Sequence, residues 1–142
     1  MNQNIFECEI RFLVLLKNCR SALSEYGIVA IDYMATFGAD FGISEYNLNG
    51  DNVYRDSEFI ARKQMAPMAI KDLVLRGLIS IEGSDGFKYI ISDKGLEAVS
   101  KISGAYSEAY SEMTNKVLDR NKNRTETDIV SEINSFVLEG KR

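Results

Sequence analysis

The fold is decided by the stretch Pro67-Met68-Ala69-Ile70-Lys71-Asp72-Leu73-Val74-Leu75-Arg76-Gly77-Leu78-Ile79. It leads into two β-rich runs, 79–82 and 87–91, which are separated by the turn signal Gly83-Ser84-Asp85-Gly86. A helix that ends at a glycine and continues directly into a hairpin is typical of a winged helix-turn-helix. The sequence therefore predicts a mainly α-helical fold with a small β-hairpin, as a winged helix-turn-helix with extra N- and C-terminal helices.

The first part of the chain predicts two helices. Over 4–22 the apolar residues recur at helical spacing on a wide face. They are Ile5, Phe6, Cys8, Ile10, Phe12, Leu13, Leu16 and Cys19. Ser24 is a suitable N-cap for a second helix over 25–37. The two cysteines lie too far apart along one helix for a disulfide or a shared metal, so we interpret both as buried thiols.

The middle of the chain predicts a long loop followed by a broken helix. The segment 38–56 is rich in Gly, Asn and Ser and contains aromatic residues, which indicates a functional loop that is fixed to the body of the domain. Asp56 or Ser57 is expected to begin a short helix that ends near Met65. Because proline is poorly tolerated inside a helix, we place a break at 65–66 and a second helix over 67–76. The alternative is one kinked helix over 57–76.

The last third of the chain predicts one long helix and one short one. Ser92 or Asp93 caps a helix over about 93–120, whose apolar residues recur every three or four positions. A polar turn follows, and Thr125 or Thr127 begins an amphipathic helix over about 126–138. The whole chain, 1–142, is interpreted as a single winged-helix domain with its core over about 4–95.

Composition narrows the class of partner. The 142 residues include 17 Lys and Arg against 21 Asp and Glu, a balance that favours a protein partner over non-specific DNA binding. No apolar run approaches the roughly 18 residues that are needed to cross a bilayer. The N-terminus lacks the positive start of a signal peptide, so we expect a cytoplasmic protein without membrane contact.

No enzymatic chemistry is indicated, and we predict no catalytic, metal-binding or cofactor-binding residues. The chain contains no His, which removes the common nucleophile pairs and most zinc sites. It also lacks a phosphate-binding Gly-rich loop. Asp32 and Asp40 are candidates for paired carboxylates, but we interpret Asp32 as a capping or salt-bridging residue and Asp40 as the organiser of a turn.

Two groups of residues are candidates for binding. The first group is basic, lies in or near the helix pair and hairpin, and would contact DNA or an acidic partner. It consists of Arg55, Arg62, Lys63, Lys71, Arg76 and Lys88. The second group is apolar, lies in the two C-terminal helices, and would contact a protein partner. It consists of Tyr106, Tyr110, Met113, Val117, Ile133 and Phe136. The alternative for the helix over 93–120 is that it folds back and covers the N-terminal helix. The final helix could equally cap the core or dock as a peptide in a groove.

The stretch from Ile31 to Gly77 resembles the middle component of bacterial ABC-three-component systems, which include Lamassu-type antiphage defence. That family has a helix ending in Leu-Asp-Tyr, a Gly-Asp-x-Gly loop, a Tyr-Arg-Ser-Gly-Glu turn, a basic pair and a Ser-Arg-Gly-Leu-Ile exit. The matching pieces are Ile31-Asp32-Tyr33-Met34, Gly38-Ala39-Asp40-Phe41-Gly42, Tyr54-Arg55-Asp56-Ser57-Glu58, Ala61-Arg62-Lys63 and Leu75-Arg76-Gly77-Leu78-Ile79. The chain departs from the pattern at Phe37, where a His is common, and over 46–50, where the family is Pro-rich.

This resemblance implies a non-catalytic accessory subunit. Such a subunit would join an SMC- or Rad50-like ATPase to an effector, often a nuclease, in a complex that senses invading DNA. The alternative is a homodimeric winged-helix transcriptional regulator that reads a specific DNA site. A general adaptor without any DNA role is the third hypothesis.

Overall fold

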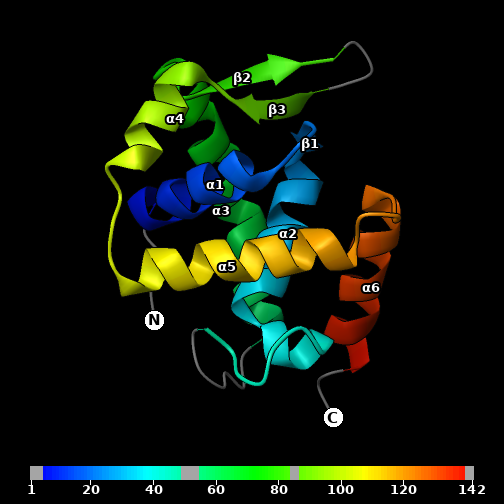
Figure 1. The fold of residues 1–142 in the computed structure, drawn as a ribbon. Helices are drawn as coiled ribbons and strands as arrows, with labels where there is room; N and C mark the ends of the chain where they lie inside the picture. The colour runs from blue at the N-terminus through cyan, green and yellow to red at the C-terminus, as the bar shows by residue number, and fades with distance from the viewer. Residues whose placement is uncertain (1–4, 49–54, 84–86, 140–142) are drawn as a thin grey trace.

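The computed structural model describes residues 5–48, 55–83 and 87–139, and within this part the side chains of 55, 56 and 139 are not described. The described part is mainly helical and contains six α-helices and a small three-stranded antiparallel sheet. Figure 1 shows the sheet at one end of the molecule, with the long helix α3 behind α1 and α2, with α5 crossing both of them, and with α6 beside α2. The mainly helical class with a β-hairpin is therefore confirmed.

The N-terminal elements are α1 (Ile5–Asn18), β1 (Leu23–Ser24) and α2 (Glu25–Thr36). The predicted N-cap is confirmed, because the Ser24 side chain accepts a hydrogen bond from the Gly27 N–H at 3.2 Å. The first helix ends four residues earlier than predicted, since the chain after Asn18 turns into β1. This two-residue strand has no sequence pattern of its own and exists because it pairs with β3, with Leu23 opposite Tyr89.

The 38–56 segment begins with the 3-10 turn η1 (Gly38–Phe41), which contains Asp40 as predicted. Phe41 is buried against Tyr33, and the Asn47 side chain accepts a hydrogen bond from the Ala39 N–H at 2.8 Å, so this part is fixed to the body. Tyr46, by contrast, is exposed and does not fix the loop as we expected. The prediction for 49–54 lies outside the described residues.

Helix α3 (Arg55–Leu75) runs without interruption through Pro67. The predicted break at 65–66 is therefore wrong, and the alternative of one helix through this region is confirmed, whereas its kink stays a prediction. Pro67 is tolerated because it lies on the exposed side of α3, where water can hydrate the Lys63 carbonyl that loses its hydrogen-bond donor. Gly77 ends the element as predicted, with a positive φ of 76° that a residue with a Cβ rarely adopts.

The hairpin consists of β2 (Ile79–Glu82) and β3 (Lys88–Ile91), with Ile81 opposite Tyr89, and the sheet order is β1-β3-β2. The predicted helix over 93–120 is wrong, because α4 (Asp93–Ser100) and α5 (Ala105–Arg120) are separate helices. Gly104, at φ 125°, turns the chain between them, so α5 reverses across α1 and α2. Helix α6 (Glu126–Glu139) follows close to the predicted position.

Candidate interaction surface

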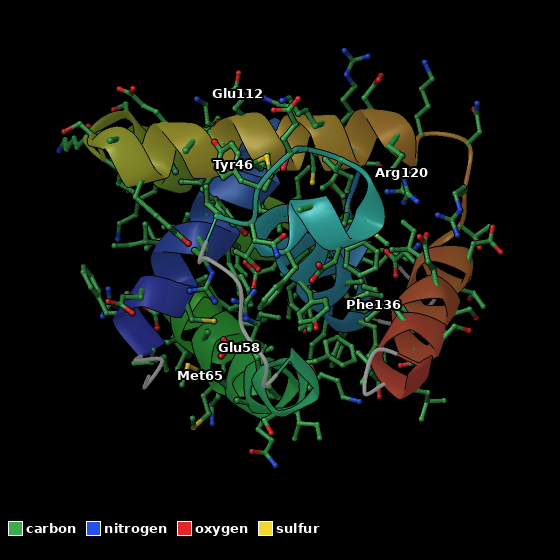
Figure 2. All side chains as sticks on the ribbon, turned by 90° about the horizontal axis from the view of Figure 1, so that it is seen from below. Tyr46, Glu58, Met65, Glu112, Arg120 and Phe136 are labelled. Carbon is green, nitrogen blue, oxygen red and sulfur yellow. The ribbon has the colours of Figure 1, made fainter. Side chains whose placement is uncertain are left out.

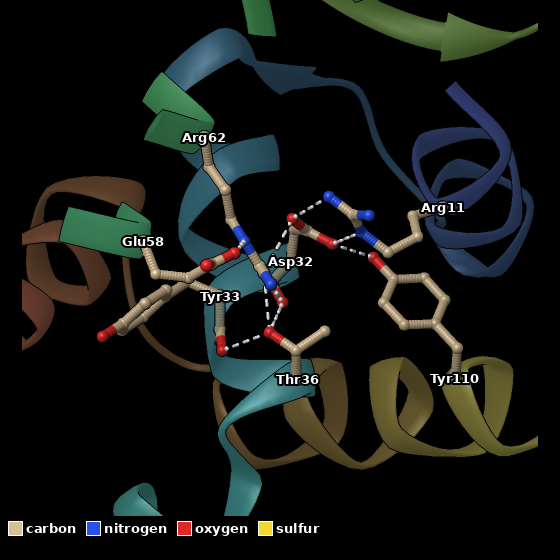
Figure 3. Close-up of polar contacts among 7 residues, drawn as sticks. All are labelled: Arg11, Asp32, Tyr33, Thr36, Glu58, Arg62 and Tyr110. Atoms are coloured by element: carbon tan, nitrogen blue, oxygen red, sulfur yellow. Dashed lines mark hydrogen bonds and ion pairs between the residues drawn. The ribbon is translucent and has the colours of Figure 1, made fainter. Parts of the chain in front are cut away.

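A cluster of charged side chains lies in the interior where α1, α2, α3 and α5 meet (Figure 3). We call it the Asp32 cluster, after the carboxylate at its centre. Arg11 Nε and Tyr110 Oη donate to Asp32 Oδ1 at 2.8 and 2.6 Å. Arg62 Nη1 donates to Asp32 Oδ2 at 3.1 Å and to Thr36 Oγ1 at 2.6 Å, while its Nε contacts Glu58 Oε1 at 3.3 Å. One carboxylate therefore holds side chains from three other helices.

The electrostatics of the Asp32 cluster favour its charged form. Burial acts to raise the pKa of Asp32, but Arg11 and Arg62 outweigh it and hold this pKa below its ordinary value. Burial and the neighbouring Asp32 charge raise the pKa of Tyr110 well above its usual range, so its hydroxyl stays a donor. This confirms the interpretation of Asp32 as a salt-bridging residue and gives the cluster a structural role.

Arg62, a predicted contact for DNA or an acidic partner, is 1% exposed and belongs to this cluster. It is not available to a partner in this structure. The sequence contains a signal that could have identified it as internal. Arg62 continues the buried helical stripe of α3, at three or four residues from its neighbours. The other members of the stripe are Phe59, Ala66, Ala69, Ile70 and Leu73.

The predicted protein-contact residues of α5 and α6 are mostly core residues. At most 2% of each of Tyr110, Met113, Val117 and Ile133 is exposed, so the alternative that these helices fold back on the body holds for them. Phe136 is half-buried and points from α6 to the Phe41 ring, whose centroid is 4.7 Å away (Figure 2). Tyr106 is the exposed member of this group, and its ring stacks on the ring of Tyr110.

Helix α6 is fixed to the body by polar contacts at its N-terminal half. Arg120 Nη2 and Arg124 Nη1 contact the Glu132 carboxylate at 2.9 and 2.6 Å. Glu126 accepts hydrogen bonds from the Ser24 backbone N–H, at 3.0 Å, and from the Ser24 hydroxyl. The Glu126 carboxylate thus lies at the N-terminus of α2, where the helix dipole favours negative charge.

Large apolar side chains are exposed at several places on the surface, and among the described residues α3 and the hairpin together carry five of them, which are Ile60, Met68, Leu75, Ile81 and Phe87. On α3 they share one side of the helix, because positions 60, 67, 68, 71 and 75 fall within about 100° of one another at 3.6 residues per turn. We call this side the α3 outer face. It consists of Ile60, Pro67, Met68, Lys71 and Leu75 with the polar Gln64 among them, all of which are exposed. Leu75 is 74% exposed, and Phe87 beside β3 is 70% exposed.

The remaining predicted basic residues do not form one patch. Lys71 lies on the α3 outer face, and Arg76 Nε is paired with Asp72 Oδ2 at 3.1 Å. Lys63 lies over the Phe59 ring, with Nζ 5.1 Å from the centroid. Lys88 lies opposite Glu82 in the hairpin register, and the side chain of Arg55 is not described. The surface of α3 is therefore more apolar than we expected from its basic residues.

The apolar α3 outer face was missed because α3 contains apolar residues on both sides. Ile60, Met68 and Leu75 are exposed apolar residues of a helix whose core residues are apolar as well. A hydrophobic pattern cannot tell which of two apolar sides faces inward. The exposed Phe87 was missed as well, because aromatic residues are common in strands.

Within residues 5–48, 55–83 and 87–139, no three Cys, Asp or Glu side chains lie close enough together to hold a metal ion. In that part of the chain, no helix combines the length and apolar character that a membrane span requires. Burial raises the pKa of Cys8 and of Cys19 to about 12, so both thiols stay protonated.

Comparison with known proteins tests the resemblance that the motifs suggested. The model of the family described as ABC-three component (ABC-3C) system Middle Component 2 matches residues 2–141. Neither the curated proteins nor the solved structures gave a match. Because the match covers nearly all of the sequence, the chain belongs to the Middle Component 2 family of ABC-three-component systems.

Proposed function

We propose that this chain is a non-catalytic accessory subunit that links an SMC- or Rad50-like ATPase to an effector in an antiphage defence complex. The observation that carries the proposal is the exposed apolar side of α3, in a chain whose family is a component of multi-part systems. Monomeric proteins seldom expose neighbouring large apolar side chains on one helix face without a partner. We assign the α3 outer face and the hairpin to docking on another component.

The order of elements supports a winged-helix architecture for this docking module. The first six regular elements after the N-terminus, leaving η1 aside, are α1, β1, α2, α3, β2 and β3. The sheet order β1-β3-β2 places the first strand beside the hairpin. In a winged helix of this order, α3 is the recognition helix and β2-β3 is the wing. The α3 outer face would then occupy the position that contacts DNA in winged-helix regulators.

The chemistry of this face favours a protein over DNA as its direct partner. Phosphate recognition depends on clustered Lys and Arg, and the chain carries a formal charge of −4. On the α3 outer face itself the only cation is Lys71, and its neighbours Met68 and Leu75 are apolar. Desolvated apolar side chains of this kind contribute to protein interfaces. DNA contact is therefore assigned to the assembled complex, and the Lamassu subtype is the system that we propose.

Co-purification tests this function. The tagged chain is co-expressed with the proteins that neighbouring genes encode, and we expect an ATPase to be recovered with it. The double variant Met68→Glu, Leu75→Glu should lose the ATPase and keep its helical circular dichroism. Leu138→Glu is the matched control, because Leu138 is 72% exposed but lies on α6. It should retain the ATPase.

Two results would contradict the proposal. If the folded double variant still recovers the ATPase, the α3 outer face is not the docking surface. If the wild-type chain is a stable dimer that shifts a specific promoter fragment and recovers no neighbour, the chain is a transcriptional regulator.

A further inference from the structure

A groove lies between α3 and α6, over the N-terminal half of α2. Its volume is about 440 Å³, which is in the range of binding pockets for small ligands and for a few side chains of a peptide. Val29, Ala30, Phe59 and Val130 form its apolar lining, and the exposed ring of Tyr26 stands at its edge. The rest of the lining is polar, so the groove has apolar residues on α2, α3 and α6 among polar ones, which are Ser24, Lys63, Glu126, Thr127, Ser131 and Asn134.

The helix packing explains why the groove is open. Helices α3 and α6 both pack on α2, but they contact each other at few positions. The contacts of Glu126 with Ser24 hold the N-terminal half of α6 against α2 rather than against α3. Because each wall of the groove is anchored separately to α2, the groove is a preformed feature of the fold.

The groove lining carries one cation and one acidic residue. Lys63 lines it, and its ammonium group lies over the Phe59 ring without forming an ion pair to any residue that the structure describes. Glu126 is the acidic residue of the lining, and its carboxylate is bonded to Ser24. An occupant that brings a carboxylate near Lys63 would therefore gain a charge-assisted contact.

We propose that this groove binds a short acidic and apolar segment of another protein chain, with an apolar side chain on Val29 and Val130 and a carboxylate on Lys63. An amphipathic segment lying between two helices is a common mode of peptide recognition. In this position the segment would lie on α2, between α3 and α6. This proposal adds a second binding site to the one on the α3 outer face. It rests on the proposed function in one respect, which is that the segment belongs to another component of the same complex.

A peptide array tests the groove separately from complex formation. The probes are overlapping 15-residue peptides that cover the proteins encoded beside this gene, and the full-length chain is applied to them. We expect binding to peptides that combine Asp or Glu with large apolar residues. Lys63→Glu should weaken that binding about tenfold or more, since like charges would then face each other. Lys116→Glu, the same change at an exposed lysine on α5, is the matched control and should leave it unchanged.

A charge exchange completes the test. Peptides whose acidic residue is replaced by Lys should bind Lys63→Glu better than they bind the wild-type chain. If no peptide binds the wild-type chain, or if Lys63→Glu binds the same peptides equally well, the groove proposal is overturned, even where co-purification recovers the ATPase. Conversely, specific peptide binding without recovery of the ATPase would retain the groove and reject the proposed function. A dimer that Lys63→Glu dissolves would identify a second copy as the occupant and overturn the proposal.

Discussion

Replacing Asp32 with Asn tests the structural role of the Asp32 cluster. The carboxylate accepts from Arg11 and Tyr110 on one oxygen and from Arg62 and Arg11 on the other, and it is fully buried. Asn has nearly the same volume but no charge, and its NH2 group cannot accept from a guanidinium. The variant would leave two buried arginines without the Asp32 charge, although Arg62 keeps its contact with Glu58.

The buried ion pair sets the expected loss in the free energy of unfolding. Removing one partner of a buried ion pair costs about 3–5 kcal/mol of the free energy of unfolding. A domain of this size has about 5–15 kcal/mol in total. With a urea dependence of about 2 kcal/mol per molar, the midpoint of urea unfolding should fall by about 2 M. Tyr110→Phe removes one hydrogen bond to the charged Asp32 and should cost less, about 1.5–3 kcal/mol.

The assay is urea unfolding followed by circular dichroism, over a range of pH. The pKa of Asp32 is lowered in the folded state, so its stabilisation is complete above the unfolded pKa of about 3.9. It is lost as pH falls through the folded pKa. The difference between wild type and Asp32→Asn should thus be constant from pH 5 to 8 and should shrink in acid. Asp119→Asn changes an exposed carboxylate and should leave the midpoint unchanged. A fall of less than about 0.5 M for Asp32→Asn would refute the reasoning.

Three further substitutions test other features of the fold. Glu9 is buried, and burial and the nearby Asp72 raise its pKa to about 7, so wild type should lose stability as pH rises from about 4.5 to 7. Glu9→Gln should remove this pH dependence. In urea unfolding at pH 8 the variant should be about 1–3 kcal/mol more stable than the wild type. Equal profiles of stability against pH for the two proteins would contradict this. Gly27→Ala would place a Cβ 2.8 Å from Glu126 Cδ, so it should stabilise the Glu126→Ala background by about 0.5–1 kcal/mol but not the wild type. A double-mutant cycle without coupling would reject that contact. Pro67→Ala should restore a helical hydrogen bond and raise the thermal midpoint, by about 1–2 kcal/mol of stability, and a lower midpoint would show that Pro67 is not strained.

Local signals predicted the elements that depend on local chemistry. Ser24 as an N-cap, Gly77 as a helix end and the β2-β3 hairpin follow from side-chain capping and from the freedom of glycine at positive φ. Features that depend on distant contacts were not predictable in this way. Strand β1 forms only through its pairing with β3, and Pro67 is tolerated only because of the side of α3 that it occupies.

The candidate site was predicted less well than the fold, because charge was taken as a sign of exposure. Arg62 and Asp32 each lie within an apolar stripe, and the two positions are 30 residues apart. Opposite charges on two inward-facing stripes indicate a buried ion pair, which sequence spacing alone does not reveal. In the same way, the 3.6-residue period of Tyr110, Met113 and Val117 is equally typical of a core and of an interface.

Asp32 and Arg62 belong to the family pattern, but both are buried and lie away from the exposed surfaces proposed for docking. Two of the motif pieces that carry the family resemblance contain these residues, and the structure joins them inside the protein. That part of the pattern therefore specifies a fold in which α1, α2, α3 and α5 are held together. The α3 outer face and the groove beside α6 contribute no side chain to this cluster. Partner binding should consequently depend on the exposed residues Met68, Leu75 and Lys63 rather than on the buried motif residues Asp32 and Arg62, and a substitution at Asp32 or Arg62 should lower stability before it changes the partner.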